Sequence, residues 1–484
     1  MRKNSIQKIR SFVLVLVLFI IASCSRNPVT GKREAFVMSE SREQQLGDQS
    51  DPSIVAQFGL YPDQTLQSFI DSKGQQMARI SHRSHLTFNF KILDSPVVNA
   101  FALPGGYVYF TRGIMAHFNN EAEFAGVLGH EIGHVSGRHS AKQQRNQILG
   151  QVGLIAGVVL SKEFRNFAED AGQAVQLMML KNSRDHEEES DKLGVEYSTK
   201  VGYDSEYMAG FFKTLNRLSG GGDQRIPTFL STHPDPLNRF ERVKSLTAKE
   251  QAKYPSKNFK VKRNEYLRML EGLIFGEDPQ QGYVQGNKFY HPSLKFEFPI
   301  PNNWRLANSP QQVQMAPADG KAAIIFMLAA EKTLDEASAN FVTQNKLQLT
   351  ESANLTVNGF PAKAIVTEQV NDQGQATLKI ITYFIQDGNT IYLFHGLSEP
   401  NTFLTYRNLF RNTMEGFARL TDPAKINVQP DRIHIHSVTQ NGTLYQAFRN
   451  ARLDTQRYDE MAIVNGMELN DQVQRGQLIK VLKK

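Results

Sequence analysis

The sequence contains few of the residues that make a disulfide-rich, membrane-spanning or strongly basic protein. One cysteine stands among 484 residues, which excludes an internal disulfide framework and a cysteine-rich metal cluster. The unbroken apolar run at residues 12–21 is shorter than the roughly 20 residues that cross a bilayer. The formal net charge is +7, and four positive residues precede this run, so the chain without them carries only +3. No nucleic-acid partner is therefore expected.

The overall composition is that of a folded protein with several domains. Hydrophobic residues make up 40% of the chain and charged residues 21%, which are ordinary values for globular proteins. At about 150 residues per domain, the length predicts about three domains.

A basic start followed by an apolar run is the form of a secretory signal. The run ends in Ile21-Ala22-Ser23-Cys24, which resembles the lipobox of bacterial lipoproteins. The resemblance implies that residues 1–23 are removed and that Cys24 is acylated, which anchors the chain to a membrane. Because Ser25 follows the cysteine in place of a retention aspartate, an outer-membrane lipoprotein facing the periplasm is favoured. The alternative is an ordinary signal peptide that ends near a cysteine.

The mature chain is predicted to be α+β, with a mainly helical zincin-type metallopeptidase domain, a β-rich α+β domain and a small C-terminal α+β module. Helical periodicity dominates the first domain apart from a strand-like stretch at residues 88–110. The second domain is expected to hold helices near 333–346 and 402–417. The predicted boundaries are 24–40 for a tether, 41–260 for the metallopeptidase domain, 261–287 for a linker, 288–420 for the β-rich domain and 425–484 for the C-terminal module.

Two local patterns predict strands and hairpins in the β-rich domain. Leu294, Phe296 and Phe298 alternate with charged residues, which is the period of a half-buried strand. Asn358-Gly359 and Asp387-Gly388 lie between apolar runs and predict tight hairpin turns.

The strongest chemical signal is His130-Glu131-Ile132-Gly133-His134. Asn120 and Glu123 predict the start of a helix that carries this motif. At 100° per residue the two histidines lie about 40° apart on one helix face, so both imidazoles can reach one ion. Glu131 projects nearby without ligating.

This helix is unusually rich in glycine, with Gly126, Gly129, Gly133 and Gly137 in or near it. Each costs about 0.8–1 kcal/mol relative to alanine in a helix interior. Several of them share the side of the histidines, which predicts the close approach of another backbone segment.

A catalytic zinc needs a third protein ligand and leaves its fourth position for water. Five acidic residues about 50 positions downstream are candidates, and most of them suit the first turn of a helix that follows Ser183. Glu187 and Asp191 share one helix face, but spacing alone does not choose the ligand. The acidic residues are Asp185, Glu187, Glu188, Glu189 and Asp191.

Together these motifs resemble the gluzincin metallopeptidases of the HtpX and CAAX-prenyl-protease superfamily, particularly its exported bacterial branch. In that family the zinc-binding helix is followed by S-R-x-x-E-x-x-x-D, which reads here as Ser183-Arg184-Asp185-His186-Glu187-Glu188-Glu189-Ser190-Asp191. The resemblance implies one zinc ion held by His130, His134 and Glu187, with Glu131 as general base. It also implies that Asp191 orients a ligating histidine.

Two further segments match the same family. Asn99, Ala100, Phe101 and Ala102 open a segment that resembles its N-A-F-A-x-P-G-G motif, a strand and turn that border the cleft and offer an edge to an extended peptide.

Thr232-His233-Pro234, followed by Arg239, resembles the family's T-H-P-x-x-x-x-R element. His233 is implied to lie near the zinc, either stabilising the oxyanion or filling the fourth position in a latent state. Arg239 is the other candidate for oxyanion stabilisation.

The C-terminal module loosely resembles a lysin motif, which implies binding to peptidoglycan. The similarity rests on Gly442-Thr443-Leu444, Asn465 and Gly476-Gln477-Leu478. A small βααβ unit with another partner is an equal alternative.

The sequence therefore predicts a lipid-anchored zinc metalloendopeptidase of the cell envelope. Its family implies that the substrates are unfolded or misassembled envelope proteins. Two alternatives stand beside it: a peptidoglycan-associated binding or chaperone-like lipoprotein with a largely latent protease fold, and a zinc amidase that cleaves the cell wall.

Overall fold

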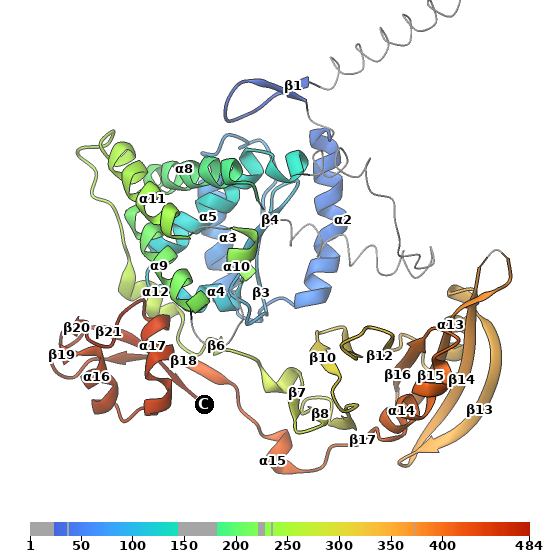
Figure 1. Cartoon of the computed structure of the whole chain (residues 1–484). Coiled ribbons are helices and arrows are strands. Elements are labelled where there is room, and N and C mark those ends of the chain that lie inside the picture. The colour runs from blue at the N-terminus through green and yellow to red at the C-terminus, as the bar shows by residue number, and fades with distance from the viewer. Residues whose placement is uncertain (1–23, 36–37, 144–181, 221–227, 234–235, 372) are drawn as a thin grey trace, which may run out of the picture.

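The computed structural model describes residues 24–35, 38–143, 182–220, 228–233, 236–371 and 373–484. It combines helices and sheets, which confirms the predicted α+β class (Figure 1). The expected signal at residues 1–23 lies outside this description. Within the described residues, the helices are all too short or too polar to cross a membrane.

The part that is predicted to be a metallopeptidase, called the metallopeptidase part below, places helices around a three-stranded sheet (Figure 1). In this sheet β3 runs parallel to β5, and β4 pairs antiparallel with the other side of β5, so β4 lies at the edge. The strands are β3 (Asn89–Leu93), β4 (Ala100–Leu103) and β5 (Tyr107–Thr111). The helices are α2 (Glu40–Phe58), α3 (Gln64–Ala78), α4 (Arg112–His117), α5 (Glu121–Ser136), α8 (Arg184–Lys200), α9 (Glu206–Gly220), α10 (Thr228–Thr232), α11 (Pro236–Gln251) and α12 (Arg263–Met269).

The start of α5 follows from its sequence. The Asn120 side chain accepts a hydrogen bond from the Glu123 amide at 2.8 Å, which confirms the predicted cap. The Glu123 carboxylate in turn accepts from the Asn119 amide at 2.7 Å. The predicted helix therefore begins where its polar start signals lie, and all of its residues are buried.

A short hairpin precedes α2 at the start of the described chain. It consists of β1 (Cys24–Arg26) and β2 (Arg33–Ala35). The Asn27 side chain accepts hydrogen bonds from the Val29 and Thr30 amides, and Gly31 has a φ of 68°. Residues 27–31 therefore form the turn of this hairpin within the predicted tether.

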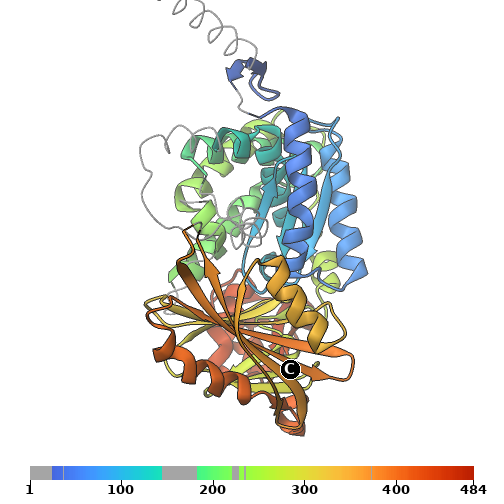
Figure 2. The same ribbon diagram turned by 90° about the vertical axis from the view of Figure 1, so that its right-hand side faces the viewer.

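The β-rich part is built on a seven-stranded antiparallel sheet of order β10-β11-β12-β16-β15-β14-β13 (Figure 2). The helices α13 (Leu334–Gln344) and α14 (Phe403–Glu415) pack on opposite faces of it. The strands of this sheet are β10 (Arg305–Asn308), β11 (Gln312–Ala316), β12 (Ala322–Leu328), β13 (Gln348–Val357), β14 (Phe360–Val370), β15 (Ala376–Asp387) and β16 (Thr390–Ser398).

A smaller sheet packs against this one and has the order β17-β9-β8-β7. Its strands are β7 (Tyr283–Gln285), β8 (Lys288–His291), β9 (Phe296–Pro299) and β17 (Ala418–Arg419), and η1 (Pro279–Gln281) precedes them.

The hairpin predictions hold, whereas one residue of the predicted strand does not. Val357 pairs with Phe360 and Asp387 with Thr390, so both turns are two-residue hairpins. Phe296 and Phe298 are buried in β9 as predicted. The prediction for Leu294 is wrong: its side chain is 42% exposed, because Lys295 has a φ of 55° and the strand begins only after it.

The C-terminal part shares its hydrophobic core with the metallopeptidase part (Figure 1). Its strand β18 (Asp431–Ser437) pairs with β21 (Leu478–Lys483) and also with β6 (Ile274–Phe275), which follows α12. Between them lie α16 (Leu444–Asn450) and α17 (Tyr458–Val464). The remaining elements are α15 (Pro423–Ile426), β19 (Gly442–Thr443), η2 (Thr455–Arg457) and β20 (Gln472–Val473).

One buried lysine ties this part to the N-terminal end of α5. The Lys480 ammonium group donates to the Ala116 carbonyl at 2.7 Å and to the Phe118 carbonyl at 2.9 Å. Its side chain has no exposed surface. The last strand of the chain therefore supports the turn that leads into the histidine-bearing helix.

Candidate metal centre

Helices α5 and α8 pack closely where glycines replace larger residues, and this packing brings the predicted ligands together. A Cβ atom on Gly129 would lie 3.0 Å from the Gly194 carbonyl oxygen, and one on Gly133 would lie 3.2 Å from the Ser190 Cα atom. Helices α5 and α8 can therefore approach this closely only without side chains at these positions. The close backbone approach predicted from the glycines of α5 is confirmed, and it brings Glu187 of α8 to the histidines of α5.

The side chains of His130, His134, Glu187 and His233 form one buried group whose ligand atoms all lie within 4.8 Å of one another. The two Nε2 atoms of His130 and His134 are 3.0 Å apart. The Glu187 carboxylate lies 3.5 Å from Nε2 of His130 and 3.4 Å from Nε2 of His134. Nε2 of His233 is 3.6 Å from the Glu131 carboxylate and 4.0 Å from that of Glu187.

The spacing of this group suits a zinc ion. Ligand atoms around a tetrahedral zinc with bonds of about 2.0–2.1 Å stand about 3.3–3.4 Å apart, close to the separations among His130, His134 and Glu187. Both carboxylate oxygens of Glu187 and of Glu131, and Nε2 of His233, are buried without a hydrogen-bond partner among the described residues. Polar atoms that are buried without a hydrogen bond are costly, and a bound ion would offset this cost in addition to the ion pair of Glu187 with Arg239. The donor set therefore fits a zinc ion.

Two further charged side chains, Asp191 and Arg239, contact the proposed ligands His130 and Glu187. The Asp191 carboxylate lies 3.1 Å from Nδ1 of His130, and the Arg239 guanidinium donates to Asp191 at 2.6 Å. Another nitrogen of Arg239 is 3.0 Å from Glu187, and the guanidinium lies 4.3 Å from the centre of the Phe212 ring. Arg239 thus binds two carboxylates in a buried setting, and these contacts hold both acidic side chains in place.

Burial shapes the protonation of the centre. Burial lowers the pKa of His130 to about 3, which keeps its imidazole neutral and able to ligate. Burial raises the pKa of Glu131 to about 7, in the range suited to a group that takes and returns a proton near neutral pH. For Asp191, burial alone would raise the pKa, but Arg239 and His130 hold it well below its usual range.

The short helix α10 covers the centre and carries His233 at its end. The Phe229 amide donates to the Val98 carbonyl at 3.2 Å, beside the start of β4. The Phe229 ring stacks on His233 with centres 4.3 Å apart, and the Thr232 carbonyl accepts from the Asn182 amide at 3.0 Å. His233 is 2% exposed and Glu131 is fully buried, so this arrangement closes the centre to solvent.

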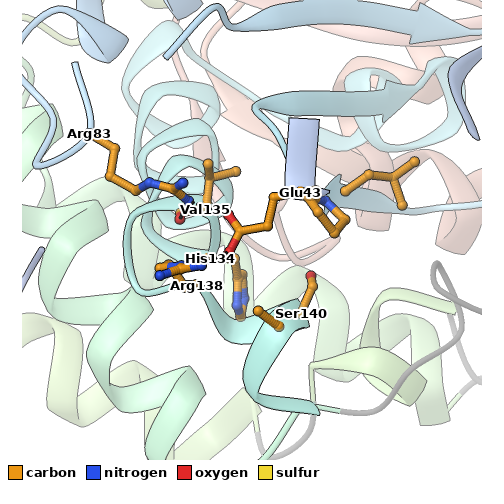
Figure 3. Close-up of a pocket in the computed structure, with 10 residues that line it drawn as sticks. Glu43, Arg83, His134, Val135, Arg138 and Ser140 are labelled. Carbon is orange, nitrogen blue, oxygen red and sulfur yellow. Dashed lines mark hydrogen bonds and ion pairs between the residues drawn. The ribbon is translucent and has the colours of Figure 1, made fainter. Parts of the chain in front are cut away.

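Buried ion pairs between charged side chains join the C-terminal end of α5 to α2. The Glu43 carboxylate accepts from Arg138 at 2.6 Å and from Arg83 at 2.8 Å. Arg83 also donates to the Val135 carbonyl at 3.0 Å. Figure 3 shows these side chains around a small pocket next to His134. Ala102 of β4 also lines this pocket, so these ion pairs lie beside the edge strand. They fix the C-terminal end of α5, the helix that carries His130 and His134.

The other predicted site residues lie where the sheet approaches this pocket. Ala100 and Ala102 are in the edge strand β4, and Asn99 comes directly before it. Phe101 is buried and stacks on Tyr109 with ring centres 4.9 Å apart. Cys24 begins β1, and Pro234 of the second motif lies outside the described residues.

His139, for which the sequence predicted no role in the site, contacts the side of His134 away from the other ligands, and it also contacts Glu189. Nδ1 of His139 is 2.9 Å from Nδ1 of His134, and Nε2 of His139 is 2.8 Å from the Glu189 carboxylate. The sequence offered one signal, a histidine five residues after a ligand. Its folding back against His134 depends on Arg138, whose φ is 57°, and no spacing rule indicates that turn.

Comparison with known proteins places this centre in a family. Residues 64–247 match peptidase family M48. The chain is 29% identical over 225 residues to the beta-barrel assembly-enhancing protease of Escherichia coli O157:H7, which covers 44% of this chain and 45% of that protein. It is also 29% identical over 191 residues to the mitochondrial metalloendopeptidase OMA1 of Arabidopsis thaliana, covering 39% and 38%. With the metalloprotease YcaL of E. coli K12 it shares 29% identity over 168 residues, covering 33% and 62%.

The chain thus spans less than half the length of the first two relatives. The family match includes every residue of the buried group, so the sequence resemblance to this superfamily is confirmed. Residues 64–247 form a zinc-metallopeptidase domain of peptidase family M48.

Proposed function

We propose that this protein is a zinc metalloendopeptidase that hydrolyses misfolded or misassembled proteins of the cell envelope. The observation that carries the proposal is the buried convergence of His130, His134 and Glu187 beside a Glu131 carboxylate that has no hydrogen-bond partner in the described structure. The names of two relatives support the proposal: the beta-barrel assembly-enhancing protease supports the substrate class, and the mitochondrial metalloendopeptidase supports the reaction.

In this proposal His130, His134 and Glu187 hold the ion. When bound, zinc supplies Lewis-acid polarisation of the scissile carbonyl and acidifies a water molecule. Glu131 takes the water proton and returns it to the leaving amine nitrogen, a role that suits its pKa of about 7. Asp191 accepts from Nδ1 of His130 and so keeps Nε2 of that ring free to ligate.

Arg239 acts in this scheme as a positioning residue. Its guanidinium is held by Asp191 and Glu187, and its side chain is 1% exposed. Because His233 is assigned to the latent state below, oxyanion stabilisation is left to the ion. The extended substrate would pair with the edge strand β4, whose Ala102 lines the same small pocket as His134.

A latent resting state is part of the proposal. Nε2 of His233 lies close enough to the other ligand atoms to complete the ligand set, and its side chain is buried. Displacement of His233 would then open the fourth ligand position to water and substrate.

The location is proposed from the N-terminus and from the relatives. An acylated Cys24 would hold the chain on the membrane, with the peptidase domain facing the periplasm and the outer membrane as the favoured site. The C-terminal module could add contact with peptidoglycan.

The test compares the parent chain with Glu131→Gln on casein and on a urea-denatured outer-membrane β-barrel protein. The variant should bind zinc as the parent does and should cleave at least about 100-fold more slowly, because a general base contributes about 10²–10⁴-fold. Equal cleavage by both proteins would remove the enzyme claim. Cleavage of muropeptides alone would favour the amidase, and suppression of aggregation without cleavage by either protein would favour the chaperone-like alternative.

A second variant, His233→Ala, tests latency. We expect faster casein cleavage with one zinc ion still bound, because three protein ligands remain. Unchanged cleavage would show that His233 does not restrain the centre.

A further inference from the structure

The two histidines of the metal centre are supported in different ways on the side away from the ion. Nδ1 of His130 meets a carboxylate directly, that of Asp191 at 3.1 Å. Nδ1 of His134 meets another imidazole, that of His139 at 2.9 Å. A carboxylate is present here too, but it contacts His139 and not His134: Glu189 lies 2.8 Å from Nε2 of His139.

We propose that His139 and Glu189 form a two-residue support that fixes the tautomer and orientation of His134 and so sets the zinc affinity of the centre. The inference rests on the proposed ligand role of His134. It concerns residues that the ligand motif does not contain.

The hydrogen-bond chemistry allows one arrangement that leaves His134 able to ligate. An ionised carboxylate only accepts hydrogen bonds, so Nε2 of His139 must donate to Glu189. A neutral imidazole then has an acceptor at its other nitrogen, and Nδ1 of His139 can receive the proton of Nδ1 of His134. His134 is left with a lone pair on Nε2, the atom that faces His130 and Glu187.

The opposite arrangement would block the ion. If Nδ1 of His139 were the donor, Nδ1 of His134 would have to accept, and the ring proton of His134 would point from Nε2 into the ligand group. Outer partners of this kind fix the ring orientation and raise the basicity of ligating histidines in metal sites.

The packing around His139 makes it a fixed support. Its side chain is 1% exposed and stacks on His186 with ring centres 4.3 Å apart and planes 7° apart. Glu189 is itself held by Lys142, whose ammonium group is 3.6 Å away. Lys142 also lies 3.4 Å from Glu34 in the N-terminal hairpin, so the support reaches the segment that follows Cys24.

A separate nucleophilic site on the same residues is excluded. The Ser190 hydroxyl is 3.2 Å from Nδ1 of His139, and with Glu189 the three side chains have the order of a serine-histidine-acid triad. Ser190 has no exposed surface, however, so no substrate carbonyl can reach its hydroxyl. The geometry therefore points to a role toward His134.

The test measures zinc affinity by competition with a chelator on the full chain, and separately the melting temperature of each metal-free protein. His139→Leu removes the acceptor and should raise the zinc dissociation constant by about 10–100-fold, the usual effect of losing such a partner. His139→Asn keeps a carbonyl oxygen near the position of Nδ1 and should restore most of the affinity. Glu189→Ala should weaken binding about 10-fold.

The matched control is Glu196→Ala, which removes another carboxylate of α8. Glu196 pairs with Lys200 at 2.6 Å and does not contact the centre, so its loss should leave zinc affinity unchanged.

Two results would overturn the proposal: zinc binding by His139→Leu within twofold of the parent, or an equal loss in the Leu and Asn variants. If His139→Leu does not fold, the zinc affinity of Glu189→Ala is the deciding measurement. A zinc affinity equal to that of the parent chain would then reject the proposed role of His139 and Glu189. A parent chain that binds no zinc at all would instead reject the proposed function.

Discussion

The metallopeptidase part and the β-rich part both bury aromatic rings, but they differ in the charged side chains that they bury. Around the metal centre the buried residues include Glu131, Glu187, Asp191 and Arg239, and Glu43 is buried between two arginines at the end of α5. Among residues 279–371 and 373–420, the buried polar side chains are all uncharged. There the core is a cluster of phenylalanines, which includes Phe296, Phe326, Phe394 and Phe417.

This difference indicates that buried charges serve a functional site in one part, whereas buried aromatic rings serve stability in the other. Buried charges are costly to desolvate and persist where they are paired or where they bind something, so they mark a functional site. Aromatic rings stabilise by area and packing and offer no ligand or proton. Of these two described parts, the metallopeptidase part therefore carries the buried charges expected of a functional site, and substitutions in the two parts should have separable effects.

The largest expected effect is the loss of the ion from the first part. Glu187→Ala removes a direct ligand, so the zinc dissociation constant should rise by more than about 100-fold, beyond the loss caused by removing an outer partner. Peptidase activity should fall with it. Zinc titration monitored by chelator competition checks the change, and a parent-like dissociation constant would contradict the ligand assignment.

The next largest effect is on the stability of the β-rich part. Phe417→Ala empties a fully packed position and should lower the free energy of unfolding by about 3–5 kcal/mol. The only tryptophan, Trp304, packs against this core and reports its unfolding by fluorescence. Leu404→Ala is the control, because Leu404 is 77% exposed and its loss should cost less than about 0.5 kcal/mol. A change in zinc affinity with Phe417→Ala would contradict the claim that substitutions in the two parts have separable effects.

A smaller effect tests whether the C-terminal strand belongs to the first part. Lys480→Met leaves the Ala116 and Phe118 carbonyls without their donor, which should cost about 1–3 kcal/mol of stability. Thermal unfolding followed by loss of bound zinc should shift, while the Trp304 signal should not. Lys483→Met, an exposed neighbour in the same strand, should leave both unchanged. A shift of the Trp304 signal alone would contradict the shared core.

The effect that is smallest at neutral pH is a pH dependence of the β-rich part. Burial lowers the pKa of His395 to about 4 from its usual 6.5. Below pH 6.5 the unfolded chain takes up a proton that the folded His395 does not, so stability falls from pH 6.5 to about 4 by up to about 3 kcal/mol. His395→Gln should flatten this slope in urea unfolding followed at Trp304. An unchanged slope would show that His395 is not the group responsible.

The sequence predicted those features that depend on neighbouring residues. The cap at Asn120, the histidine pair one turn apart and the turn at Asn358-Gly359 all follow from short-range rules. The close approach of another segment to α5 was also predicted, because glycines destabilise a helix interior unless they allow such a contact. That the segment is α8 was not predicted. The choice of Glu187 among five acidic residues came only from the family resemblance, since spacing along a helix does not say what lies opposite.

The features that the sequence did not predict depend on distant pairings or on unusual backbone. Strand β6 is two residues long and pairs with β18, more than 150 positions away, and no local pattern specifies that partner. His139 reaches His134 because Arg138 adopts a left-handed conformation after the helix end, stabilised by its buried bond to Glu43. Tertiary contacts of this kind override local preference.

The most direct test is a crystal structure of the zinc-loaded chain with anomalous data at the zinc edge. We predict one zinc ion per chain, about 2.0–2.2 Å from Nε2 of His130, Nε2 of His134 and a carboxylate oxygen of Glu187. An anomalous peak elsewhere, or a Glu187 carboxylate turned away from the ion, would contradict the account.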